Sequence, residues 1–65
     1  MNHERATYYA SIIREQVQVP VEVKSYASDL SRIAVHLPFM VKVIDTPEQA
    51  DSFLRDLNEY RYSFG

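Results

Sequence analysis

The chain has 65 residues, no cysteine and a formal net charge of −2. This length allows one small domain, and the lack of cysteine excludes a disulfide framework or a thiolate metal site. The content of 46% hydrophobic and 12% aromatic residues is typical of an ordered globular protein. No apolar run approaches the roughly 18 residues of a membrane span, so we expect a cytoplasmic protein without a membrane partner.

The charges are unevenly distributed. Residues 1–44 carry five basic and four acidic side chains, whereas residues 45–65 carry two basic and five acidic ones. There is no cluster of positive charge, which disfavours nucleic acid as a partner, because phosphate contacts supply most of the affinity for nucleic acids. The acidic stretch is more typical of a solvated helix face than of a binding surface.

Residues 2–16 are predicted to form a helix. The apolar positions follow a 3.6-residue period: Ala6, Tyr9, Ala10, Ile13 and Val17. We expect Tyr8 and Ile12 to widen this apolar face. Asn2 is placed to cap the first turn.

A strand is predicted next, because valines at alternate positions from Val17 to Val23 give a period of two. Their neighbours are polar or proline, as in a strand with one solvated side. Pro20 cannot donate a ladder hydrogen bond, so the strand either lies at a sheet edge or begins after the proline.

Residues 30–37 fit two interpretations. As a strand, Ile33, Val35 and Leu37 alternate with other residues, whereas the spacing from Leu30 to Leu37 also matches one face of a helix. We favour the strand because the apolar run is short and ends at a proline.

Residues 39–45 are predicted to be a strand with apolar residues on both sides. We expect one set to face the core, namely Phe39, Val41 and Val43. The other set is then exposed: Met40, Lys42 and Ile44.

A second helix is predicted from its local signals. Thr46 is the expected N-cap, Pro47 the first helical residue, and Gln49, at the third helical position, the residue that completes a capping box. The helix is expected to fade near Tyr60. Residues 61–65 then form a candidate aromatic tail, whose rings would share one side of an extended segment.

Together these elements predict a single α+β domain spanning residues 1–65, in the order α-β-β-β-α. The connections between strands are too short for parallel crossovers, so the three-stranded sheet is expected to be antiparallel. Both helices are expected to cover one face of the sheet, which gives a two-layer domain.

The uncovered sheet face is the candidate site. Its mixture of aromatic, arginine and other apolar side chains fits a solvated surface and equally fits a protein interface. The predicted partner-binding residues on this face are Tyr26, Arg32, His36, Met40 and Ile44. The aromatic tail either packs against the domain or frays, or it docks on a partner protein. For the second alternative, Tyr62 and Phe64 are also predicted to be partner-binding residues.

The sequence contains no catalytic, metal or cofactor motif. His3 and His36 lie in different elements without metal-ligand spacing, and Gly65 is the single glycine, which excludes a glycine-rich phosphate loop. Glu22 and His36 are potential neighbours, but an exposed pair lacks a pocket that shifts pKa values. We therefore predict no enzyme activity, no cofactor and no small-molecule substrate. An enzyme would require a pocket between subunits around His36.

The predicted order of elements is similar to that of double-stranded-RNA-binding domains. Those domains contact phosphates through a lysine cluster at the start of their second helix. Here residues 46–51 read Thr-Pro-Glu-Gln-Ala-Asp, which is acidic. The resemblance is therefore limited to element order and implies no function.

The sequence is compatible with two functions. The preferred one is a small non-catalytic interaction module, acting as an accessory subunit, inhibitor or regulator, that binds a protein partner or itself through the exposed sheet face. The alternative is a nucleic-acid-binding regulator, in which dimerisation gathers five basic side chains: Arg5, Arg14, Lys24, Arg32 and Lys42.

Overall fold

The computed structural model describes residues 1–64 and the side chains of residues 1–59. Helix α1 covers His3–Gln16, and the Asn2 side chain caps it by accepting a 2.8 Å hydrogen bond from the Arg5 backbone N–H. The predicted helix and its cap are confirmed. Tyr8, however, is 61% exposed and does not widen the buried face. At 3.6 residues per turn it lies about 200° around the helix from Ala6.

The three strands form an antiparallel sheet in the order β1-β2-β3. Their bounds are β1 Val21–Ala27, β2 Leu30–His36 and β3 Val41–Ile44. The strand interpretation of residues 30–37 is therefore confirmed. The first strand lies at an edge and also begins directly after Pro20, so both consequences of that proline are observed.

Helix α2 covers Pro47–Phe64. Thr46 Oγ1 accepts a 3.1 Å hydrogen bond from the Gln49 N–H, and Gln49 Oε1 accepts a 2.7 Å bond from the Asp45 N–H. The cap is confirmed, although Gln49 reaches one residue further back than in a regular capping box. The predicted end near Tyr60 is wrong, because the backbone stays helical to Phe64. No proline or glycine interrupts residues 48–64.

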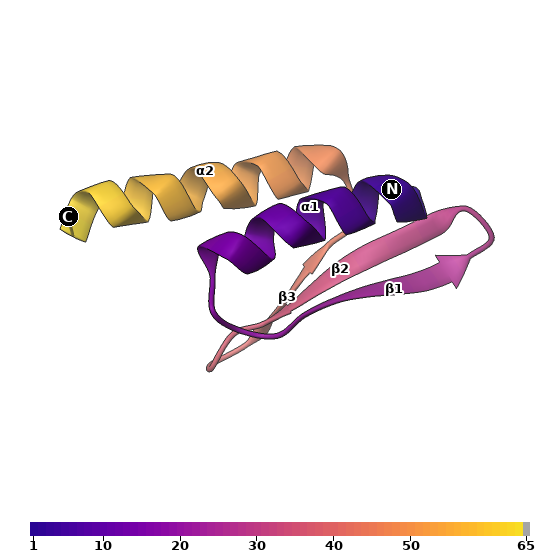
Figure 1. Ribbon diagram of the computed structural model, residues 1–65, viewed down its shortest axis with the longest axis horizontal. Helices are drawn as coiled ribbons and strands as arrows, with labels where there is room; N and C mark the ends of the chain where they lie inside the picture. Colours follow the sequence, from indigo (N-terminus) through magenta and orange to yellow (C-terminus); the bar gives the residue numbers. More distant parts are fainter. Residues whose placement is uncertain (65) are drawn as a thin grey trace.

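Both helices lie on the same face of the sheet, as predicted (Figure 1). Helix α1 packs on β1 and β2, while α2 lies beside α1 and contacts β3. The C-terminal part of α2 extends beyond the rest of the fold. The core between the layers is small and consists of Ala6, Tyr9, Ala10, Ile13, Val21, Ile33, Val35, Ile44 and Ala50.

The facing of β3 is the reverse of the prediction. Ile44 is paired with Ile33 and is fully buried beneath the helices, whereas Val43 is paired with Ala34 on the other face and is 43% exposed. The connection sets this register, because the Leu37 N–H donates to the Met40 carbonyl at 2.9 Å before pairing starts at Val41. A shift of one residue exchanges the faces of a whole strand.

The first residue of the chain is integrated into the sheet. The Ser31 N–H donates to the Met1 carbonyl at 2.7 Å, and the Met1 nitrogen donates to the carbonyls of Ser31 at 3.3 Å and Asp45 at 2.7 Å. Strand β3 ends at Ile44, and beyond that point Met1 pairs with the same side of β2. This pairing links the start of α1 to the sheet. Neither helix, over the residues that are described, has the length and hydropathy to cross a bilayer.

Candidate functional site

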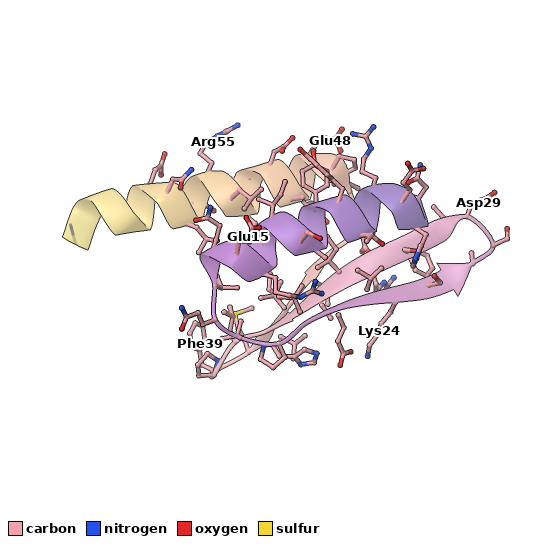
Figure 2. The ribbon with its side chains drawn as sticks, viewed as in Figure 1. Glu15, Lys24, Asp29, Phe39, Glu48 and Arg55 are labelled. Atoms are coloured by element: carbon pink, nitrogen blue, oxygen red, sulfur yellow. The ribbon has the colours of Figure 1, made fainter. Side chains whose placement is uncertain are left out.

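The sheet face turned away from the helices, called the open face below, is the candidate site. The cross-strand pairs place on it Glu22, Lys24, Tyr26, Arg32, Ala34, His36, Val41 and Val43. Figure 2 shows Lys24 projecting from β1 on the side opposite both helices. No helix covers this face, so it is the part of the sheet that another molecule can reach.

The charged side chains of the open face are paired with one another. Glu22 lies 3.5 Å from Lys24 Nζ and 3.6 Å from His36 Nε2. Arg32 Nε lies 3.1 Å from an oxygen of Asp45, and its guanidinium carbon lies 4.3 Å from the centroid of the Tyr26 ring. These partly exposed pairs contribute at most about 1 kcal/mol each to folding. Their main consequence is a face without an unpaired charge.

The β3 side of the open face is apolar. Val41 and Val43 remain roughly half exposed there. Ala34 lies between these two valines and β1 and is only 5% exposed, because its neighbours cover it. Phe39, in the connection between β2 and β3, is 80% exposed at the end of this strip (Figure 2). The apolar strip therefore continues from the middle of the sheet to its end.

The predicted partner contacts are only partly brought together on this face. Tyr26, Arg32 and His36 lie on it as expected. Ile44 is a correction, because it belongs to the core and no partner can touch it. Met40 lies in the connection before β3, half exposed but not on the strand where it was expected.

Val41 and Val43 take the place that was predicted for Ile44. The alternation of residues 39–45 could not identify them, because both alternating sets are apolar. The signal was in the short connection after Leu37, whose hydrogen bond sets the pairing of His36 with Val41. Register, and not hydrophobic period, selects the exposed residues of this strand.

The aromatic tail has a different backbone from the one predicted. Residues 61–64 are helical, so rings at alternate positions do not line one side of an extended segment. The side chains of Tyr62 and Phe64 lie outside the described part of the structure, and their role as partner contacts stays a prediction.

Glu22 and His36 are neighbours as expected, but they lie on an open surface. Two hollows lie elsewhere among the described residues, one of ≈490 Å³ beside Asn2, Arg5 and Tyr8, and one between β3 and α2. Among the described residues, no group of three His, Asp or Glu side chains is placed to hold a metal ion. Glu22 and His36 line neither of these hollows.

The five basic residues of the nucleic-acid hypothesis do not form one patch in a single chain. Lys24 and Arg32 are paired on the open face. Arg14 Nη2 donates a 2.8 Å hydrogen bond to the Val21 carbonyl, and Lys42 points to the helix side of the sheet. Within the described residues, these basic side chains therefore do not form a shared phosphate-binding surface.

A polar cluster at the start of α1, formed by the buried Ser31 with the exposed Ser25 and His3, was not anticipated. Ser31, 1% exposed, has its Oγ 3.0 Å from the Ser25 Oγ and 3.5 Å from the His3 Nδ1. The cluster satisfies a hydroxyl that β2 directs into the core. Because Ser31 is buried, its oxygen is not accessible to a ligand.

The chain matches no protein-family model, and comparisons with curated proteins and with solved structures return no match either. The class that the fold and site define is a two-layer α+β domain with one uncovered, charge-paired sheet face.

Proposed function

We propose that this protein is a small non-catalytic interaction module whose open face binds the open face of a second copy. The observation that supports the proposal is the uncovered sheet face, with its apolar strip of Val41 and Val43 beside charges that are already paired. We also predict that the protein acts as an accessory subunit, inhibitor or regulator, and that it is located in the cytoplasm.

The charge balance of the open face suits self-association. Two acidic residues, Glu22 and Asp45, are matched by two basic residues, Lys24 and Arg32. A two-fold contact places the same surface on both sides, so a strongly charged face would repel its copy. A neutral face with internal ion pairs avoids this repulsion and buries no unpaired charge.

The size of the face sets the expected strength of the contact. The three strands are spaced by about 4.8 Å, and the two longer ones, β1 and β2, have seven residues that rise about 3.3 Å each, so the face measures at most roughly 15 × 23 Å. Two such faces bury roughly 700 Å² in total, which is below the roughly 1,200 Å² of stable specific interfaces and is typical of weak, transient contacts. We therefore expect a reversible dimer whose population rises with protein concentration.

The proposal is tested by the mass of the protein in solution over a range of concentrations. We expect the mass to rise toward twice that of the monomer. Val43→Glu and Tyr26→Glu, at opposite sides of the open face, should both hold the protein at monomer mass. Asn58→Glu, exposed on α2, is the matched control and should dimerise like the original chain.

A monomer mass at every concentration would refute the proposal. Dimerisation that resists Tyr26→Glu would refute it as well, because the contact would then lie elsewhere. Circular dichroism of each variant checks that the fold is retained.

A further inference from the structure

The two edge strands of the sheet differ in how they are protected. On β1, the Arg14 side chain donates to the outward carbonyl of Val21 at 2.8 Å, and a bulge interrupts the pairing between Ser25 and Ala27. Occupied edge groups and bulges are both devices that discourage the addition of another strand. The β1 edge is therefore partly closed by the protein itself.

The backbone directions in β2 show which groups of β3 face outward. The His36 N–H donates to the Pro20 carbonyl at 2.9 Å, so the backbone groups of His36 point toward β1. Because these directions alternate along a strand, Val35 points toward β3 and is hydrogen-bonded to its partner Lys42.

Val41 and Val43 flank Lys42, so their N–H and C=O groups point away from the sheet. They present two donors and two acceptors in the spacing that an antiparallel strand recognises. Their side chains stand on the open face, whereas the Lys42 side chain stands on the helix side. The β3 edge is thus ready to accept a further strand.

A groove runs along this edge beneath α2, with a volume of ≈260 Å³. Its lining includes Lys42, Val43, Glu48, Ser52, Phe53 and Asp56. Lys42, Glu48 and Asp56 form no ion pair with any described residue. The groove therefore has an uneven charge, with two carboxylates and one ammonium available to a ligand.

This arrangement determines which side chains an added strand should carry. Its residue opposite Lys42 points to the same side of the sheet, into a groove where the two carboxylates of Glu48 and Asp56 outnumber the Lys42 ammonium. The like charge of Lys42 opposes a basic residue close to the strand, so the groove favours a long basic side chain that extends past Lys42 to the carboxylates. The residues on either side of it meet Val41 and Val43, which favours β-branched apolar side chains.

We propose that the β3 edge binds an extended segment of a partner protein, in which a basic residue lies between two β-branched residues, as an additional antiparallel strand. This site is separate from the open-face contact proposed above and does not depend on it. The recognition combines backbone hydrogen bonds to Val41 and Val43 with the charge of Glu48 and Asp56.

A second copy is a poorer occupant of this groove than a peptide. Two β3 strands paired across a two-fold axis would lie about 4.8 Å apart, whereas a helix with its side chains is about 10 Å wide. Helix α2 lines the edge in each copy, so the two α2 helices would compete for one space. A segment without its own helix layer avoids this conflict.

The probe is a synthetic peptide with the sequence of residues 39–45, which contains Val-Lys-Val, and the control peptide carries Lys42→Glu. The full-length protein, labelled with ¹⁵N, is titrated with each peptide. We expect slowed amide exchange at Val41 and Val43, and binding about tenfold tighter for the lysine peptide than for the glutamate peptide. In the protein variant E48K/D56K this preference should reverse.

Equal binding of the two peptides would overturn the proposal, as would no binding or chemical-shift changes confined to the open face. Protection of Val41 and Val43 that rises with protein concentration without peptide would overturn it too, because the edge would then belong to self-association. Tyr26→Glu should leave peptide binding unchanged. Loss of the dimer and loss of this site are therefore distinguishable.

Discussion

On the helix-covered face of the sheet, Ile33, Val35 and Ile44 are fully buried, whereas on the open face Val41 and Val43 remain roughly half exposed. The same three strands supply both sets. The side chains of the covered face are packed against the helices of the same chain. On the open face the charged side chains are paired with one another, but nothing in the chain packs against the apolar strip. The packing that stabilises a single chain thus lies on one face of the sheet, and the face for which we propose an interaction lies on the other.

Neighbouring residues of β3 provide the strongest test of this division. We expect Ile44→Ala to lower the free energy of unfolding by about 2–5 kcal/mol, because it opens a cavity in the core. Val43→Ala should cost less than about 1 kcal/mol, since its side chain is partly solvated. Chemical denaturation at low protein concentration measures both.

A domain of this size has only about 3–10 kcal/mol of stability, so a loss at the upper end of the expected range would leave Ile44→Ala largely unfolded. Ile44→Val, expected to cost about 0.5–1.5 kcal/mol, then replaces it. If Val43→Ala costs as much as the change at Ile44, the assignment of the two faces is wrong.

The cap of α1 tests how the covered face is kept in place. Asn2→Ala removes the acceptor for the Arg5 N–H and should lower the free energy of unfolding by about 1 kcal/mol. Asn58→Ala, in the exposed interior of α2, is the matched control and should change it by less than about 0.5 kcal/mol. Equal effects in thermal denaturation would show that the cap does not hold the helix.

The smallest expected effect belongs to the open face. Arg32→Met removes both the ion pair with Asp45 and the contact with Tyr26, yet we expect a loss of no more than about 1 kcal/mol, since the groups are partly solvated. The loss should shrink at high salt. Arg55→Met on α2 is the control, and a salt-independent loss well above 1 kcal/mol would contradict the description of this face as marginally stabilising.

The sequence predicted the element types correctly where local signals agreed. Asn2 and Thr46 are caps, Pro20 precedes an edge strand, and the short apolar run before Pro38 is a strand. Each of these depends on interactions within a few residues or on one hydrophobic period. Such interactions are readable without knowledge of distant parts of the chain.

The candidate site was predictable only in part. The placement of Tyr26, Arg32 and His36 on the open face was predicted correctly. In β1 and β2 one set of alternating residues is more apolar than the other, and the more apolar set faces the core. The exchange of Ile44 for Val43 was not predictable from alternation, because both sets in β3 are apolar. The edge groove was not predictable at all, since Lys42 and Asp56 meet only when α2 packs beside β3.

By itself, the sequence determined the order of helices and strands, the two helix caps and the antiparallel two-layer plan, because periodicity and short connections are local properties. The tertiary structure alone decided which residues of β3 are buried, which sheet edge is closed by Arg14 and which charges surround the free edge. These are set by strand register and helix packing, where a displacement of one residue moves every side chain to the opposite face.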